Sequence, residues 1–191
     1  IAQAANATSG TVWVMAPMVS TVHDVKAFTV KVRAHGLPVA GMMVEVPAAA
    51  LRARHMMELV DFASIGTNDL TQYAMATDRM AGELAELLDP WQPAVLDLIA
   101  ATGAAGKAAN KAVGVCGEAA RDPLLALVLV GLGVTSLSMA PSGVPGVRFA
   151  LSRTTLATCE RMAEAARNAR DAVDGKAAVE KLVDPEVLLA L

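Results

Sequence analysis

Two carboxylates, Glu45 and Asp69, stand where chemistry is expected in a parallel α/β protein. Glu45 closes an apolar run that begins at Gly41, and Asp69 follows the run Phe62–Gly66 with Asn68 beside it. Polar residues that follow parallel strands gather at the carboxyl edge of the sheet. A pair of carboxylates there suits Mg²⁺, which takes one or two of them and completes its shell with substrate and water. Taken singly, Glu45 could cap a helix and Asp69 could be a turn residue, but the pair favours a metal site.

Arg79 lies ten residues after Asp69, beyond a segment that would carry it back over the same edge. A guanidinium in that place can grip a phosphate or a carboxylate with two parallel hydrogen bonds. The alternative is an exposed arginine paired with its neighbour Asp78, which is the more common fate of any one arginine.

Cys116 stands between Gly114 and Gly117 at the end of another apolar run, with Glu118 two residues beyond. The glycines leave room for the thiol to face a ligand, and a thiol in such a place can deliver a proton to carbon. The alternative is a small buried hydrophobe, which is the interpretation we adopt for Cys159. His23, His35 and His55 fall in predicted helices or at their ends, so we expect no phosphoryl-accepting histidine among them.

The elements that must position these residues alternate between short β-branched runs and longer stretches of helical period, which indicates a parallel α/β sheet. The predicted strands are Val12–Met15, Gly41–Glu45, Phe62–Gly66, Ala112–Cys116 and Ser136–Met139. The predicted crossover helices are Thr21–His35, Pro47–Glu58, Pro93–Asn110 and Pro123–Leu132, with Thr154–Asp174 and Lys176–Ala190 after them, divided at Gly175. Five such units cannot close an eight-stranded barrel of about 250 residues, so a barrel would lack about its first three units.

The composition narrows the classes of function. With 191 residues, 54% of them hydrophobic, the chain can bury one large core. A net charge of −3 and scattered Lys and Arg argue against nucleic acid. The most apolar run, Leu124–Val134, is too short to span a bilayer, so no membrane association is expected. Two dissimilar cysteines and no leader favour the cytoplasm, and a start at Ile1 favours an excised piece of a longer protein.

Three strings together resemble a known family. Gly41–Ala49 reads GMMVEVPAA, Phe62–Tyr73 reads FASIGTNDLTQY, and Gly114–Glu118 reads GVCGE. They are similar to the phosphoenolpyruvate-binding barrel of Enzyme I of the sugar phosphotransferase system, and the resemblance covers nearly the whole chain. It implies a (β/α)8 TIM-barrel fold, of which residues 1–191 would supply about the last five units.

The resemblance also implies roles for the residues singled out above. Mg²⁺ would be held by Glu45 and Asp69, the anionic groups of phosphoenolpyruvate would be bound by Asn68 and Arg79, and Cys116 would protonate the enolpyruvate carbon. The activity implied is phosphoryl transfer from phosphoenolpyruvate to an enzyme histidine and on to a small phosphocarrier protein in sugar uptake, by a cytoplasmic homodimer. The role of Glu118 stays open.

The same resemblance shows what this sequence does not contain. It has no counterpart of the family's histidine-bearing and phosphocarrier-binding domains, nor of the arginines on the early barrel strands. We therefore expect the isolated chain to lack full phosphotransfer activity. Three alternatives remain: the corresponding domain of pyruvate phosphate dikinase or phosphoenolpyruvate synthase, a lyase of a related barrel group, and a non-catalytic dimerising remnant.

Overall fold

The computed structural model describes residues 1–190, and its centre is a sheet of five parallel strands. The strands are β1 (Trp13–Ala16), β2 (Val39–Val44), β3 (Phe62–Gly66), β4 (Ala112–Cys116) and β5 (Ser136–Ser138). They lie side by side in chain order, and each pairs in parallel with the next. Strictly sequential order is that of a barrel segment, whereas a doubly wound sheet reverses its order at a switch point. The predicted α/β class and partial-barrel arrangement are confirmed.

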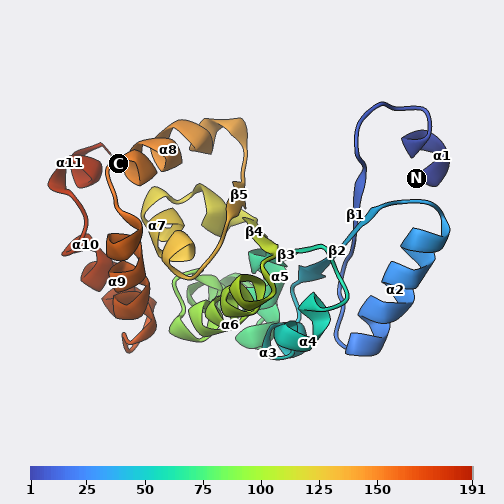
Figure 1. Ribbon diagram of the computed structural model, residues 1–191. Coiled ribbons are helices and arrows are strands. Elements are labelled where there is room, and N and C mark those ends of the chain that lie inside the picture. Colours follow the sequence, from blue (N-terminus) through green and yellow to red (C-terminus); the bar gives the residue numbers. More distant parts are fainter. Residues whose placement is uncertain (191) are drawn as a thin grey trace.

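The crossover helices follow one another in an arc outside the sheet (Figure 1). They are α2 (Val22–Ala34), the pair α3 (Pro47–Leu51) and α4 (Ala53–Met57), α6 (Pro93–Ala109) and α7 (Pro123–Gly131). Pro47, Pro93 and Pro123 each stand in the first turn, where a missing N–H costs no hydrogen bond. Thr21 and Asp24 form a reciprocal capping box at the start of α2, and the hydrogen bonds from Thr21 lower the pKa of Asp24.

The structure departs from the predicted helices at several places. Helix Pro47–Glu58 is interrupted at Arg52, which ends α3 and begins α4. Short helices not predicted from the sequence lie between strands and crossover helices: α5 (Thr67–Ala74) and the 3₁₀ turns η1 (Gly82–Leu88) and η2 (Glu118–Arg121). A further helix, α8 (Val144–Ser152), follows a turn of 3₁₀ helix, η3 (Pro141–Gly143), in a region that was expected to hold none.

The predicted break at Gly175 is wrong. The last part of the chain forms α9 (Leu156–Arg167), α10 (Ala172–Glu180) and α11 (Pro185–Leu189), and Gly175 lies inside α10. The break falls earlier because the Asp171 carboxylate accepts the N–H of Asp174 and so starts a new helix. A short helix, α1 (Ala2–Ala5), precedes β1.

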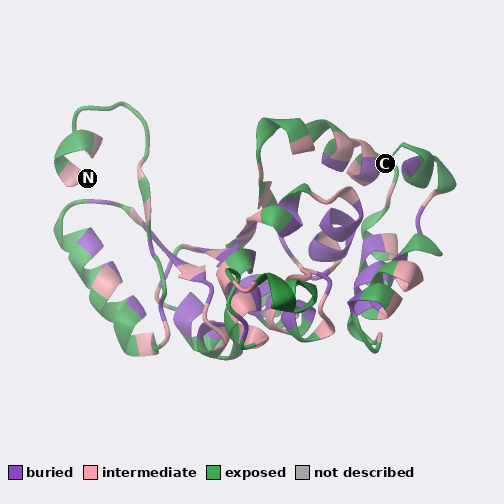
Figure 2. Cartoon of the chain, turned by 180° about the vertical axis from the view of Figure 1, so that it is seen from behind, coloured by how far each residue is buried: buried purple, intermediate pink, exposed green. Residues whose placement is uncertain are grey.

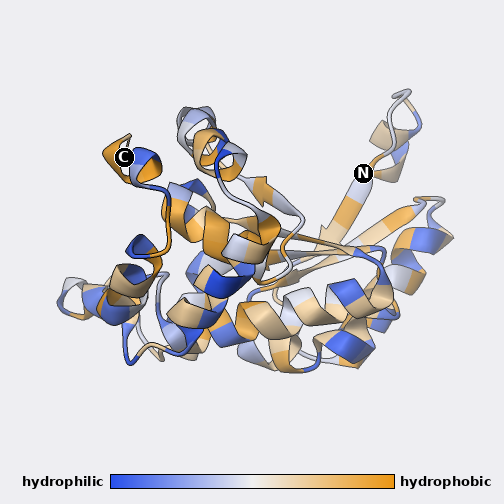
Figure 3. Ribbon diagram, turned by 60° about the vertical axis from the view of Figure 1, so that its left-hand side comes forward, coloured by the Kyte–Doolittle hydropathy of each residue, from blue (hydrophilic) through white to orange (hydrophobic). Residues whose placement is uncertain are grey.

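The core lies between the sheet and the arc of helices (Figures 1 and 2). Met42, Val44, Ile65 and Val115 point into it from the strands and are fully buried. Helix α7 is apolar around its whole circumference and packs on α8 and α9. Its ribbon is mostly orange, the colour of hydrophobic residues, in Figure 3. None of the described helices is long and apolar enough to cross a membrane.

The other face of the sheet carries a different set of side chains. Trp13 is 60% exposed there and its ring lies 4.9 Å from that of Phe62, which covers Gly41. Ser64, Gly114 and Cys116 share this face with Glu45, because side chains alternate along a strand and the register places them in line. Of the predicted site residues, Glu45 and Cys116 therefore belong to this face.

Candidate functional site

Glu45 directly follows β2, and its carboxylate is buried at the carboxyl end of the sheet. The residue is 5% exposed, and Oε1 accepts the N–H of Met18 at 2.7 Å. Met18 adopts φ 53°, a left-handed conformation that is costly for a methionine. A Cβ on Gly66 would stand 2.8 Å from Glu45 Oε2, so any larger residue there would have to displace this carboxylate. The helix-capping alternative for Glu45 is wrong, since Val46 is the N-cap of α3 and Glu45 bonds across to the β1 loop.

The negative charge of Glu45 has no cationic partner among residues 1–190. Each ion pair found there uses other carboxylates, namely those of Asp61, Asp69, Asp97, Glu118, Asp174 and Glu186. A buried carboxylate normally pairs with a cation or binds a metal, because desolvating an uncompensated charge is expensive. The Glu45 site therefore fits a divalent cation.

Asp69 lies in the first turn of α5, directly after β3, the neighbour of β2. Its Oδ1 accepts a hydrogen bond from Arg79 Nη2 at 2.6 Å, with the two side chains 28% and 47% exposed. The alternative pairing of Arg79 with Asp78 is wrong, because the Arg79 guanidinium pairs with Asp69 and the Asp78 carboxylate accepts the N–H of Met80. The structure thus brings Arg79 back to the sheet edge, as expected, and places it on one of the two predicted metal ligands.

Asn68 ties the loop after β3 to the loop after β4. Its Oδ1 accepts the N–H of Glu118 at 3.3 Å, and Thr67 Oγ1 donates to Cys116 O at 3.0 Å. Gly117 between them has φ 101°, and a Cβ there would meet Thr67 Oγ1 at 2.7 Å and Asn68 Oδ1 at 2.9 Å. With Oδ1 used in this way, the Asn68 amide presents its NH₂ group as a donor for an anion.

Cys116 ends β4 and its thiol is half-buried, in polar surroundings. Sγ lies 3.8 Å from Ser64 Oγ and 3.5 Å from Ile65 O, both on the neighbouring strand β3. Cys159 is different, since it is 1% exposed inside α9 and burial raises the pKa of its thiol. Of the two cysteines, Cys116 has the access that a proton donor needs, and the bland interpretation of Cys159 as a buried hydrophobe agrees with its place in the core.

Sequence reasoning missed three residues that shape this site: Met18, Ser64 and Thr67. Ser64 was detectable, because a hydroxyl at an alternate position of an apolar strand marks the same face as Gly66. Thr67 belongs to α5, which was not predicted, and no signal in the sequence marks the Met18 N–H as a partner of Glu45. Glu118 forms an exposed ion pair with Arg121 at 3.3 Å.

The arrangement limits what a metal could receive from the protein. Within the described part of the chain, no three residues among His, Cys, Asp and Glu gather into a metal cage. Glu45 and Asp69, from adjacent strand ends, are the carboxylates offered, which matches the one or two that Mg²⁺ takes when a phosphorylated substrate completes its shell. A hollow of about 860 Å³ lies at the opposite end of the sheet, beside Lys111, Thr135 and Arg167, and belongs to another part of the molecule.

The sequence of this chain is similar to a known protein family and to several known proteins. Residues 1–156 match the family described as PEP-utilising enzyme, PEP-binding domain. A phosphoenolpyruvate-protein phosphotransferase of Streptomyces coelicolor is 54% identical over 91% of this chain and 31% of its own length. The protein of the same name from Haloferax volcanii is 44% identical over 84% of this chain and 30% of its own length. A multiphosphoryl transfer protein of Xanthomonas campestris is 42% identical over 80% of the chain and 19% of its own length.

The chain therefore spans about a third of the length of the phosphotransferases it matches. The matched region contains all the site residues described above, from Met18 to Cys116. This chain belongs to the family of phosphoenolpyruvate-binding domains of phosphoenolpyruvate-utilising enzymes.

Proposed function

We propose that this chain is the phosphoenolpyruvate-binding part of a phosphoenolpyruvate-protein phosphotransferase, with Mg²⁺ held by Glu45 and Asp69. The observation that carries the proposal is the buried Glu45 carboxylate, which pairs with no cation among residues 1–190. It lies at the end of β2, next to β3, which leads into Asp69. Family membership and the names of the relatives support phosphotransfer over the dikinase, synthase and lyase alternatives.

Each side chain has a role that its contacts support. The Asn68 NH₂ group and the Arg79 guanidinium bind the phosphate and carboxylate oxygens of the substrate. Bound Mg²⁺ would supply charge neutralisation to the phosphoryl group during transfer. When the bond between phosphorus and the enol oxygen breaks, the phosphoryl group leaves for a histidine acceptor and Cys116 Sγ gives its proton to the methylene carbon, which produces pyruvate. Ser64 Oγ, beside Sγ, positions the thiol and stabilises the thiolate that remains.

Metal and substrate binding can be tested by calorimetric titration of the chain with Mg²⁺ and phosphoenolpyruvate. We expect heat from the parent protein, and none from Glu45→Gln or Asp69→Asn. Asp78→Asn is the matched control, because its carboxylate lies in the same region but accepts only the N–H of Met80. Equal heats in all four proteins would refute the ligand assignment, and no heat in the parent would favour a non-catalytic remnant.

The role of Cys116 can be tested without any phosphoryl acceptor. The thiolate would remove a methyl proton from pyruvate, so the chain with Mg²⁺ in D₂O should exchange the methyl protons for deuterium, measured by NMR. Cys116→Ala should abolish the exchange, and Cys159→Ala, which changes only a buried thiol, should retain it. Exchange that persists in Cys116→Ala would assign the proton transfer to another group. A condensation product with an added oxo-acid would instead favour a lyase.

The proposal extends to the partners and setting of the enzyme. The name of the relatives specifies a protein as the phosphoryl acceptor, and we propose that a histidine domain and a small phosphocarrier protein in sugar uptake fill this role. We also propose a cytoplasmic setting, since the Cys116 chemistry needs a reduced thiol. A homodimer is proposed from the resemblance to Enzyme I alone. Light scattering over a range of protein concentrations tests the dimer, and a monomer at every concentration would count against it.

A further inference from the structure

The segment Met75–Arg79, between α5 and η1, carries two signs of a strained conformation. Ala76 adopts φ 49°, which an alanine rarely does. The Thr77 hydroxyl is buried, and among the described residues it is the buried side-chain oxygen that lacks a hydrogen-bond partner. Both features raise the free energy of this arrangement, so other contacts must hold the segment in place.

Five hydrogen bonds tie it to α5. The N–H groups of Met75, Ala76 and Thr77 donate to the carbonyls that end the helix, those of Thr71, Tyr73 and Gln72, at 2.9, 3.4 and 3.0 Å. The Arg79 N–H donates to Gln72 Oε1 at 3.4 Å. The shortest contact is the ion pair of Arg79 Nη2 with Asp69 Oδ1 at 2.6 Å. The strained segment thus ends on a carboxylate that the proposed function assigns to the metal.

We propose that Met75–Arg79 is a two-state positioning segment. In the state described here, Arg79 neutralises Asp69. When a divalent cation binds Asp69, Arg79 is displaced, Ala76 returns to negative φ, and the freed guanidinium binds the substrate anion. This inference rests on the proposed function, and it adds an order of events: the cation binds before the anion.

The physical reason is competition for one carboxylate. A divalent cation on Asp69 would place two more positive charges beside the guanidinium, and the repulsion favours release of Arg79. The released guanidinium then lacks a counter-charge, which the substrate phosphate provides. Because relaxation of Ala76 and Thr77 accompanies release, cation and anion binding each favour the same state and strengthen one another.

The test measures the affinity for Mn²⁺ alone, by electron paramagnetic resonance of the free ion, in the chain and four variants. Arg79→Ala should bind Mn²⁺ about tenfold more tightly, because Asp69 is no longer occupied. Ala76→Gly should bind about fivefold more weakly, since glycine accepts positive φ without cost and stabilises the closed state. Thr77→Val should also bind more weakly, because valine removes the unpaired hydroxyl. Neither Ala76→Gly nor Thr77→Val changes the charge of the protein.

Arg121→Ala is the control for general electrostatics. Arg121 lies at the same end of the sheet but pairs with Glu118, so its removal lowers the positive charge without freeing Asp69. We expect its Mn²⁺ affinity to stay within about twofold of the parent. Circular dichroism checks that each variant is folded.

The outcomes separate this inference from the function on which it rests. If Ala76→Gly and Thr77→Val leave the Mn²⁺ affinity unchanged, and Arg79→Ala binds Mn²⁺ no more tightly than Arg121→Ala, the two-state segment is overturned. The proposed metal site would stand in that case. No Mn²⁺ binding by the parent overturns both. Inorganic phosphate that binds equally well with and without Mn²⁺ overturns the order of events.

Discussion

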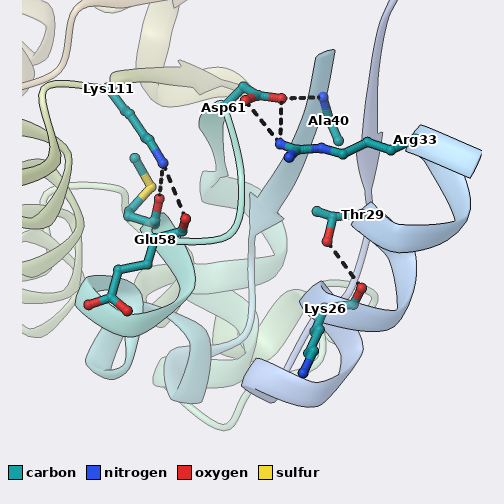
Figure 4. Close-up of polar contacts among 8 residues, drawn as sticks. Lys26, Thr29, Arg33, Ala40, Glu58, Asp61 and Lys111 are labelled. Carbon is teal, nitrogen blue, oxygen red and sulfur yellow. Dashed lines mark hydrogen bonds and ion pairs between the residues drawn. The ribbon is translucent and has the colours of Figure 1, made fainter. Parts of the chain in front are cut away.

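The polar groups at the two ends of the five-stranded sheet differ in the partners that they have within the chain. At the amino end, Asp61 accepts the N–H of Ala40 at 2.8 Å and pairs with Arg33, and Lys111 donates to Met57 O at 2.6 Å (Figure 4). At the carboxyl end, within residues 1–190, Glu45 is buried without a cationic partner and the Thr77 hydroxyl has no hydrogen-bond partner. Asp61 is thus paired within the chain, whereas Glu45 keeps a buried carboxylate available for a ligand.

Backbone conformation divides in the same way. The non-glycine residues with positive φ in the described chain are Met18, Ala76 and Asn110. Asn110 is at the amino end, where it caps α6 in the left-handed conformation that asparagine tolerates. Met18 and Ala76 are unsuited to that conformation, and both lie in loops beyond the carboxyl ends of strands. Strain of this kind gathers at functional sites, so the comparison indicates that one end stabilises the fold and the other serves binding.

The largest effect is expected for Glu45→Gln. Glutamine keeps the acceptor for the Met18 N–H but removes the buried charge, so Mg²⁺ affinity should fall by about 100-fold, or roughly 2.7 kcal/mol, while the free energy of unfolding rises. Calorimetry and urea denaturation measure the two quantities. If Glu45→Gln binds Mg²⁺ as tightly as the parent, or is less stable than the parent, the contrast between the two ends of the sheet is contradicted.

At the amino end, Asp61→Ala should lower the free energy of unfolding, in contrast to the rise expected for Glu45→Gln. The Ala40 N–H loses its acceptor and Arg33 its partner, at a cost of about 2 kcal/mol in urea denaturation. Asp97→Ala removes the exposed pair with Arg167 and should cost no more than about 0.5 kcal/mol. If both substitutions lowered the free energy of unfolding by the same amount, the contacts of Asp61 would contribute no more than an exposed ion pair.

Two glycines with positive φ allow a matched comparison. Gly36, near the amino end, has φ 76° and open space around it, so Gly36→Ala should cost about 1 kcal/mol of stability. Gly117→Ala adds a clash with Thr67 and Asn68, so it should cost more, about 2 kcal/mol, and also weaken phosphoenolpyruvate binding. Thermal denaturation and calorimetry measure these effects. Equal stability losses, with binding intact, would exclude the tight contact at Gly117.

The smallest effect concerns thiol reactivity and leaves stability unchanged. A thiol reagent at pH 8 should label half-buried Cys116 first, because Cys159 is inaccessible and burial raises its pKa, which lowers its thiolate fraction. Mass spectrometry of the digested protein identifies the labelled cysteine. Mg²⁺ with phosphoenolpyruvate should slow the labelling of Cys116, and labelling of Cys159 first in the native protein would contradict the assignment.

The sequence by itself determined the elements whose signals are local. The apolar runs placed Phe62–Gly66 and Ala112–Cys116 with the bounds that the structure has, and proline marked the start of three helices. Candidate site residues could be proposed in advance because parallel strands deliver the residues that follow them to one edge. The short helix α5 was missed because it follows β3 without an intervening loop and five of its eight side chains are polar, and Gly175 misled because a glycine inside a helix resembles a break.

Only the tertiary structure decided which groups of the site form pairs. Glu45 with the Met18 N–H, Arg79 with Asp69, and Cys116 with Ser64 are separated by 27, 10 and 52 positions. No local preference encodes such contacts, because each depends on where the sheet and its loops bring two distant segments. The sequence names the groups that can do chemistry; the fold determines which of them are neutralised within the chain and which stay free to bind.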